Sequence, residues 1–210
     1  MTQAFRLLFV NVGVPREFEF QGKRATSSIW KAPVEGPVRA RGVNLEGDDQ
    51  ADREVHGGPD KAVYAYAIEE IGRWESEVGR ALPLSAFGEN FTTSGIDVSD
   101  ALIGERWEIG TALFEVSEPR APCWKLGVKM EDPGFPRKFT KAGRPGAYLR
   151  IVREGVLAAG DEIRVLDRPG HGVRAADVFR IYTRERKNAR LLLEVPALSE
   201  SWKEWARLRL

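Results

Sequence analysis

Residues 106–126 read RWEIGTALFEVSEPRAPCWKL, and this stretch decides the expected fold. Residues 106–109 and 112–116 are rich in β-prone side chains and flank a Gly110-Thr111 turn. Such a pattern predicts a β-hairpin whose second strand is buried. The hairpin leads the chain directly into a turn that contains two prolines.

Cys123 lies in that turn and is the only cysteine of the chain. Pro119 and Pro122 stop a regular ladder or helix, so the cysteine is predicted on a stiff turn at a strand end. The nearby cations Arg120 and Lys125 favour a thiolate, which ligates metals or attacks electrophiles. The alternative is a buried cysteine that serves as a small apolar residue. A lone cysteine excludes an intrachain disulfide and, with two histidines, a cysteine-rich zinc site.

The first 167 residues consist mostly of short β-prone runs separated by glycine and proline turns. An amphipathic helix is predicted over residues 67–79, with Gly79 as its stop. About seven to nine short strands with one main helix favour a mainly β fold, a closed β-barrel, over alternating β/α units. The strands are predicted at residues 5–14, 17–20, 38–43, 147–152 and 162–166, in addition to the hairpin. Residues 155–160 are predicted to be a turn, and residues 133–136 to break a short helix that follows Cys123.

The periodicity becomes helical beyond a Pro/Gly-rich linker at residues 168–172. Three helices are predicted, at residues 175–185, 188–195 and 199–208. Ser199 is the predicted N-cap of the last one. Three short helices are too few to bury a core by themselves. We therefore predict a barrel domain over residues 1–167 and a small three-helix appendage over residues 168–210.

Composition and charge narrow the class of protein. The net charge is +1, although residues 168–210 carry ten Lys and Arg against five Asp and Glu. No run of about 18 apolar residues could cross a membrane, and no cleavable signal precedes the first strand. One cysteine agrees with a reducing compartment, so we predict a cytoplasmic protein with no membrane partner. No Gly-x-Gly-x-x-Gly, Walker or Cys-x-x-Cys motif occurs, so no nucleotide or flavin site is visible.

Hydroxyl and ammonium groups gather at Ser27, Ser28 and Lys31. Hydroxyls and an ammonium match phosphoryl oxygens, which makes this cluster a candidate anion or phosphate site. A solvated strand edge has the same composition and is the alternative.

Two glycine-containing corners carry further candidates. His56 precedes a tight Gly57-Gly58-Pro59 turn, where it is a candidate general acid or ligand contact, or else a structural cap of the turn. Glu89 and Asn90 offer a charge, an acceptor and a donor, which suits a polar heterocycle. A turn supported by its own side chains is the alternative for the second corner.

Four segments in chain order resemble the MOSC domain family, most closely its bacterial branch linked to resistance against N-hydroxylaminopurine. They are Leu45-Glu46-Gly47-Asp48, His56-Gly57-Gly58-Pro59-Asp60, Phe87-Gly88-Glu89-Asn90 and Ser117-Glu118-Pro119-Arg120-Ala121-Pro122-Cys123. The match spans nearly the whole chain, including Ser27, Ile29 and Lys31, and a C-terminal three-helix segment that this branch also carries. Each segment is weak alone, but four in this order around one cysteine are specific.

The resemblance implies a β-barrel that holds the molybdenum cofactor, with Cys123 as the thiolate ligand of the metal. A pyranopterin dithiolene supplies two sulfurs and oxo groups complete the shell, so one protein thiolate is enough. Ser27 and Lys31 are implied to lie near the pterin phosphate. The residues implied to line the cofactor pocket are His56, Asp60, Glu89, Asn90 and Arg120. Pyridoxal phosphate binding is linked to the family as a whole and is assigned to no residue here.

The resemblance also implies a reductase of N-hydroxylated compounds, such as N-hydroxylaminopurines. Because the chain shows no flavin or nicotinamide site, a separate reductase, a flavoprotein or similar, is expected to supply electrons. His56 or Glu89 is the expected proton donor, beside Cys123 at the metal.

Two other classes of function stay open. A non-catalytic carrier of the cofactor or of sulfur would carry the same cysteine. Nucleic-acid binding by the basic tail is disfavoured, because a surplus of five charges over residues 168–210 is usually a solvated face. Docking of the electron donor is the preferred use of the three helices.

Overall fold

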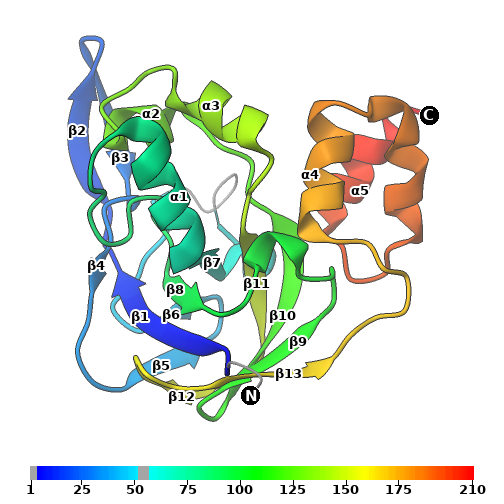
Figure 1. Ribbon diagram of the computed structural model, residues 1–210, viewed down its shortest axis with the longest axis horizontal. Helices are drawn as coiled ribbons and strands as arrows, with labels where there is room; N and C mark the ends of the chain where they lie inside the picture. The colour runs from blue at the N-terminus through cyan, green and yellow to red at the C-terminus, as the bar shows by residue number, and fades with distance from the viewer. Residues whose placement is uncertain (1–3, 52–56) are drawn as a thin grey trace.

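The computed structural model describes residues 4–51 and 57–210. Within them the chain is mainly β with several helices (Figure 1). The strands are β1 (Arg6–Val12), β2 (Arg16–Phe20), β3 (Lys23–Ser27), β4 (Ala32–Pro33), β5 (Val38–Arg41), β6 (Asn44–Leu45), β7 (Val63–Ala67), β8 (Phe91–Ser94), β9 (Arg106–Ile109), β10 (Ala112–Pro119), β11 (Ala147–Arg153), β12 (Gly155–Leu157) and β13 (Ile163–Asp167). The helices are α1 (Ile68–Val78), α2 (Trp124–Lys129), α3 (Phe135–Ala142), α4 (Ala175–Thr183) and α5 (Glu200–Arg207), with 3-10 turns η1 (Pro59–Lys61), η2 (Val98–Asp100) and η3 (Arg186–Glu194).

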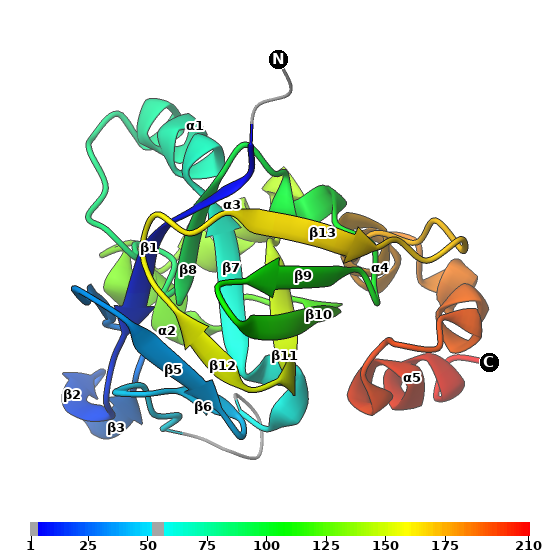
Figure 2. The ribbon, with the colours of Figure 1, turned by 90° about the horizontal axis from the view of Figure 1, so that it is seen from below.

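A large mixed sheet forms the centre of the molecule (Figure 2). Its eight strands lie in the order β13-β9-β10-β11-β7-β8-β1-β4. The pair β7 and β8 runs parallel, which requires a crossover, and α1 lies in that connection. Two smaller sheets have the orders β12-β5-β6 and β2-β3.

The start of β1 approaches the segment that enters β13. Arg6 and Glu162 form an isolated antiparallel bridge, and the Ile163 amide donates to the Phe5 carbonyl at 2.9 Å. These contacts are not a strand ladder, so the expected closed barrel is unconfirmed and stays a prediction. A mainly β fold around a large sheet is confirmed.

The predicted hairpin is confirmed, with Ala112 of β10 opposite Ile109 of β9. Gly110 in its turn has a φ of 58°, a left-handed conformation that favours glycine. A Cβ added there would lie 2.2 Å from the Val156 carbonyl oxygen, so the turn tolerates no side chain. The helix predicted over residues 67–79 is also confirmed as α1, which ends at a left-handed Gly79.

One local prediction was wrong, because residues 155–160 contain β12, which pairs with β5 and places Val156 opposite Arg39. The short helix predicted after Cys123 is α2, and it ends before residues 133–136, as expected. The helix α3 was not predicted, and Pro136 lies in its first turn, where a missing N–H costs no hydrogen bond. The described part of residues 1–167 therefore contains three α-helices, one more than predicted.

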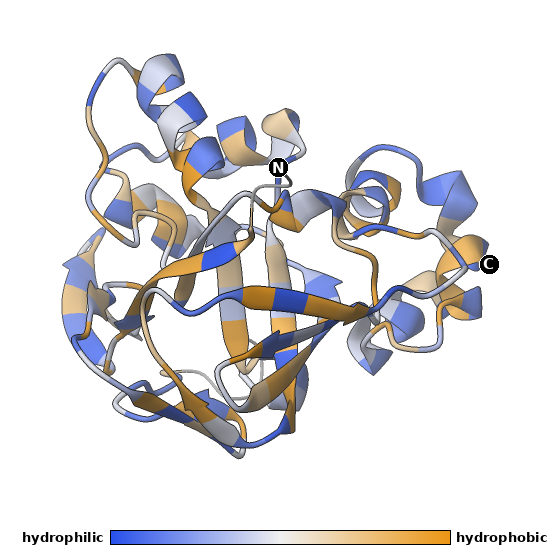
Figure 3. Cartoon of the chain, turned by 60° about the horizontal axis from the view of Figure 1, so that its bottom comes forward, coloured by the Kyte–Doolittle hydropathy of each residue, from blue (hydrophilic) through white to orange (hydrophobic). Residues whose placement is uncertain are grey.

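The core follows from alternation along the strands, visible as alternating hydrophilic and hydrophobic bands (Figure 3). On β10, Phe114 is fully buried and meets Phe91 edge-on, with ring centroids 5.2 Å apart. The alternation ends at Ser117, and every side chain from there to Arg120 is buried. β10 is therefore covered on both faces where it approaches Cys123.

A second apolar cluster holds α1, α2 and α3 together near the upper end of the sheet in Figure 1. Trp74 of α1 stacks on Phe139 of α3 with an interplanar angle of 4°. Phe87 and Phe135 pack against the same indole. This cluster fixes the segment that carries Gly88, Glu89 and Asn90.

The C-terminal helices α4, η3 and α5 form a separate group at the right of Figure 1. Their middle element is a 3-10 helix rather than the predicted α-helix. Ser199 occupies the predicted N-cap position of α5, without a side-chain capping hydrogen bond. Val178, Leu192 and Trp202 belong to the same apolar cluster as the sheet core. The division into two domains stays a prediction. No helix in the described part of the chain is long and apolar enough to cross a bilayer.

Candidate functional site

A pocket opens where β3, η1, β7, β11 and the turn after β10 meet. Four of the predicted site residues line it together with the cysteine, although they lie far apart in the sequence. They are Ser27, Lys31, Asn90, Arg120 and Cys123. The long-range pairing of the sheet therefore brings together most of the described candidates.

The hydroxyl pair at the end of β3 is only partly used by the protein. Ser27 Oγ accepts a hydrogen bond from the Ile29 amide at 3.2 Å. Ser28 Oγ is buried and has no hydrogen-bond partner among the described residues, although Ser28 lines the pocket. A buried hydroxyl without a partner is uncommon and can be satisfied by a ligand.

Lys31 forms an ion pair with Asp48 in the wall of the pocket. The side chains are 9% and 2% exposed, respectively, so the pair is buried. Burial lowers the pKa of Lys31, and Asp48 counteracts this by stabilising the ammonium. Asp48 also accepts from the Gly13 amide at 2.7 Å, which fixes the carboxylate.

Asn90 lines the pocket, but the protein already uses its side-chain amide. Its Nδ2 donates to Asp48 Oδ2 at 2.9 Å and to the Asn11 carbonyl at 3.1 Å. Its Oδ1 accepts from the Tyr64 amide at 3.1 Å. Asn90 is therefore placed to hold Asp48, and through it Lys31, in position.

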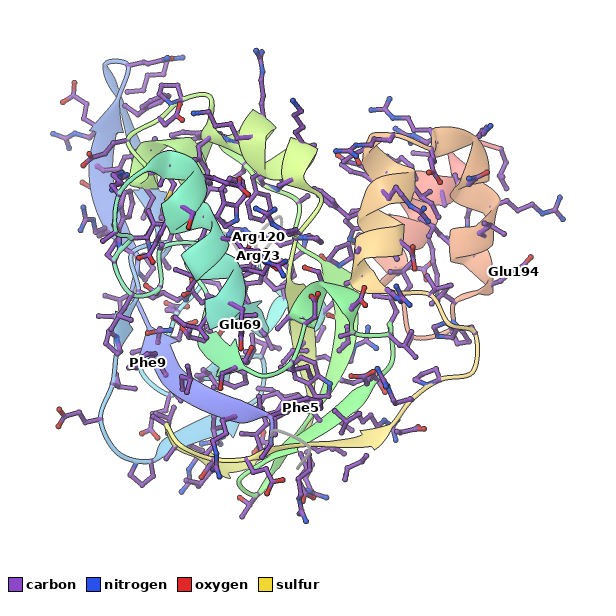
Figure 4. All side chains as sticks on the ribbon, in the orientation of Figure 1. Phe5, Phe9, Glu69, Arg73, Arg120 and Glu194 are labelled. Carbon is purple, nitrogen blue, oxygen red and sulfur yellow. The ribbon has the colours of Figure 1, made fainter. Side chains whose placement is uncertain are left out.

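Arg120 is buried within the body formed by the sheet and α1 to α3, where it is labelled in Figure 4. Its guanidinium donates to the Phe87 carbonyl and lies 4.8 Å from the centroid of the Tyr64 ring. The hydrogen bond and the cation–π contact together fix a positive charge in the pocket.

Cys123 is half-buried and lines the pocket between β10 and α2. β10 ends at Pro119, and Cys123 is the N-cap residue of α2. The predicted turn at a strand end, followed by a short helix, is confirmed. Lys125 lines the same pocket.

Glu89 is fully buried and does not line the pocket. Its carboxylate accepts from the Phe87 amide at 3.0 Å and from Thr92 Oγ1 at 3.2 Å. Burial raises the pKa of Glu89, and the nearby Lys129 opposes this shift. Lys129 donates to the carbonyls of Ile29 and Ser85, and burial lowers its pKa to about 7.

Asp60 does not line the pocket, whereas the adjacent Lys61 does. Asp60 pairs with Arg150 at 2.7 Å. Successive side chains of a 3-10 turn point about 120° apart, so neighbours in η1 face different surroundings. His56, the other candidate of this segment, lies outside the described residues.

The sequence did not single out Lys61, Tyr64 or Tyr148, which also line the pocket. Tyr64 on β7 and Tyr148 on β11 are directly opposite each other in the sheet. Their rings lie 5.2 Å apart. No local signal marks them, because their pairing depends on strands about 80 residues apart.

A family model for the MOSC domain matches residues 52–164, more than half of the chain. The chain belongs to the MOSC domain family. The resemblance seen in the sequence motifs is thereby confirmed.

Relatives of this MOSC protein include YflK of Bacillus subtilis, an uncharacterised protein 37% identical over 96% of this chain and 92% of its own length. YiiM of Escherichia coli is 31% identical over 84% of this chain and 81% of its own length. The crystal structure of YiiM from Geobacillus stearothermophilus superimposes with a TM-score of 0.81 and 34% identity, over 98% of this chain and 99% of the other. A protein of Gibberella moniliformis named Reductase is 32% identical over 84% of this chain but only 32% of its own length.

The MOSC family implies a molybdenum cofactor, and the described pocket fits such a group in its chemistry. Among its described residues the pocket carries four cations, Lys31, Lys61, Arg120 and Lys125, against the carboxylates of Asp48 and Asp49. The surplus of positive charge and the hydroxyl of Ser28 suit a phosphate. A cysteine in the same pocket suits a soft metal ligand.

Proposed function

We propose that this MOSC protein is a molybdenum-cofactor-dependent reductase of N-hydroxylated compounds, such as N-hydroxylaminopurines. The observation that carries the proposal is the half-buried Cys123 in a cationic pocket that also contains the Ser28 hydroxyl, which has no hydrogen-bond partner among the described residues. The name of the Gibberella relative, Reductase, supports the reaction class. We place the reaction in the cytoplasm.

In this proposal Cys123 supplies the protein thiolate to the metal. Ser27 and Ser28 bind the pterin phosphate through their hydroxyls, and Lys31 and Arg120 neutralise its charge. Asn90 contributes indirectly, because its amide is committed to Asp48.

The net reaction converts R–NH–OH, two electrons and two protons into R–NH₂ and water. The bound cofactor supplies two-electron redox chemistry at the metal. Lys31 and Arg120 contribute a fixed positive potential in the pocket.

The electrons come from a separate reductase, a flavoprotein or similar. The match to the Gibberella protein covers 32% of that protein, so that relative contains much sequence that this chain lacks.

Glu89 and His56 are the two candidate proton donors. Glu89 does not touch the pocket, so a proton from its carboxyl would have to pass through neighbouring groups. His56 is the other candidate. The carboxylate of Asp60 is paired with Arg150. In the proposal, Asp60 therefore positions η1, which carries Lys61.

The test is the molybdenum and pterin content of protein purified from a host that makes the cofactor. Wild type is compared with Cys123→Ala, and both are assayed with an N-hydroxylaminopurine and candidate reductases. Near-stoichiometric metal that is lost in the variant, together with turnover by the wild type, supports the proposal. Cofactor without turnover would indicate a carrier, and absence of metal and pterin in the wild type, beside a loaded control molybdoenzyme, would refute the cofactor.

A further inference from the structure

Cys123 also lines a second cavity, which lies between the sheet and the C-terminal helices. Its volume is about 310 Å³, at the lower end of the roughly 300–1,000 Å³ range of small-molecule pockets. Residues of β10, β11, η1, α4 and α5 form its walls. The cavity therefore suits a small molecule placed beside the cysteine.

One wall of this second cavity is aromatic. Tyr182 of α4 lies 5.0 Å from Trp202 and 5.1 Å from Trp205 of α5, measured between ring centroids. The Arg209 guanidinium lies 4.2 Å from the Trp205 ring and holds the indole in place. Such a wall favours a flat ring, which can stack or meet the rings edge-on.

Glu118 of β10 is the acidic group of the cavity, and its side chain is 2% exposed. Its Oε1 lies 3.7 Å from Lys61 Nζ. Its Oε2 is buried and has no hydrogen-bond partner in the described part of the chain. A buried carboxylate oxygen without a donor is rare in native proteins and indicates a missing partner.

The backbone explains why a carboxylate points here. The pairing of β10 with β11 shifts register between Val116 and Glu118, and such irregularities redirect side chains near functional sites. Burial raises the pKa of Glu118, while Lys61, Ser199 and Trp202 favour its ionised form. The carboxylate is therefore oriented by the fold but incompletely satisfied.

We propose that this cavity is the substrate subsite and that it binds a planar nitrogen heterocycle with an exocyclic N–H group. Glu118 Oε2 accepts that N–H, and Tyr182, Trp202 and Trp205 pack against the ring. Cys123 borders both cavities, so a bound heterocycle lies next to the proposed cofactor pocket. The inference rests on the proposed function, because it identifies where the N-hydroxy substrate lies.

The test is calorimetric binding of adenine and of purine, which lacks the exocyclic amino group. Wild type, Glu118→Leu and Glu118→Gln are purified from the cofactor-producing host. We expect Glu118→Leu to weaken adenine binding at least about tenfold, since one charge-assisted hydrogen bond is lost, with Glu118→Gln in between. Purine binding should change little. Glu105→Gln is the matched control, because Glu105 is an equally buried carboxylate that does not line this cavity.

Equal adenine affinity in wild type and both Glu118 variants overturns the inference, and so does a parallel loss of purine binding. Cofactor content and reduction of an N-hydroxylaminopurine are measured on the same wild-type preparation. If both are absent while the adenine difference persists, the proposed function fails and the heterocycle site stands. If both are present without an adenine difference, only the subsite is wrong.

Discussion

Lys31 and Asp48 form a buried ion pair in the pocket wall, and Asn90 holds the carboxylate from a third segment of the chain. The ion pair places the Lys31 ammonium in the same pocket as the hydroxyls of Ser27 and Ser28. The carboxylate of Asp48 balances the charge of this ammonium. A compensated cation can face an incoming anion without the full cost of an isolated buried charge.

Replacing Asp48 by asparagine should destabilise the protein by about 3 to 5 kcal/mol, because Lys31 would lose its paired carboxylate inside the protein. Denaturant unfolding at neutral pH measures the effect. Asp132→Asn is the control, since Asp132 pairs with Lys138 at the surface, and it should change stability little. Equal effects of the two substitutions would show that the pocket pair is effectively solvated.

Lys129 should make stability increase with pH. Its pKa is lowered to about 7 in the folded protein, chiefly by burial, against an ordinary value of 10.5. Between these values the unfolded chain binds a proton that the folded protein does not, so the free energy of unfolding rises as pH rises through this window. Glu89, Arg120, Lys31 and Arg16 are the charged groups that act on the amine.

The substitution Lys129→Met should therefore flatten the pH dependence between about pH 7 and 10. Denaturant unfolding of both proteins at several pH values in this window gives the comparison. Lys31 titrates in the same direction, so part of the slope should remain. An unchanged slope in the variant would mean that the folded Lys129 stays protonated throughout.

Alanine substitutions at Gly88 and Gly143 form a matched pair that tests how closely the backbone at Gly88 packs against Ile29 in the pocket wall. Their φ values are 74° and 70°, so alanine is similarly strained at both. A Cβ at Gly88 would lie 2.7 Å from Ile29 Cγ1, whereas a Cβ at Gly143 meets nothing within 4 Å.

We expect Gly143→Ala to cost about 1 to 2 kcal/mol from backbone strain alone. Gly88→Ala should cost about 1 to 3 kcal/mol more through overpacking, and it should reduce cofactor content because Gly88 lines the pocket. Thermal unfolding and metal analysis measure the two effects. Indistinguishable variants would contradict a close fit between Gly88 and Ile29.

Charge reversal at Lys125 should reduce molybdenum and pterin content several-fold, because it replaces an attraction to the anionic cofactor with a repulsion. Lys125→Glu is compared with Lys138→Glu, whose exposed side chain lies on α3. Metal analysis of protein from the same host is the measurement. Similar losses in both variants would point to a general charge effect instead of local binding.

The sequence predicted those helices and strands that are determined by neighbouring residues. The hairpin ending before Cys123 and the helix ending at Gly79 follow from turn chemistry and periodicity. β12 and α3 were missed because tertiary pairing and a proline in a first helical turn overrode the glycine and proline signals. The isolated bridge between Arg6 and Glu162 joins segments far apart in the sequence, and no local pattern encodes it.

The sequence predicted which segments of the chain form the site, but not which side chain of each segment faces the pocket. Ser27, Lys31, Asn90, Arg120 and Cys123 line the pocket, but Asp60 does not, because the orientation of one side chain in a 3-10 turn cannot be read from the sequence. Glu89 was expected in the pocket and lies in the core behind it. Glu118 Oε2, which has no hydrogen-bond partner in the part of the chain that the structure describes, lies in a cavity walled by distant C-terminal helices, and no sequence signal marks it.

The hydrogen bonds of Asn90 also constrain the order of assembly. They join residues 79, 42 and 26 positions away in the chain, and closing such long loops is entropically costly. The pocket is thus completed only after these distant segments have docked. Under the proposed function, a nascent chain would therefore lack the cofactor site, and loading after folding would stabilise the folded protein by binding only to it.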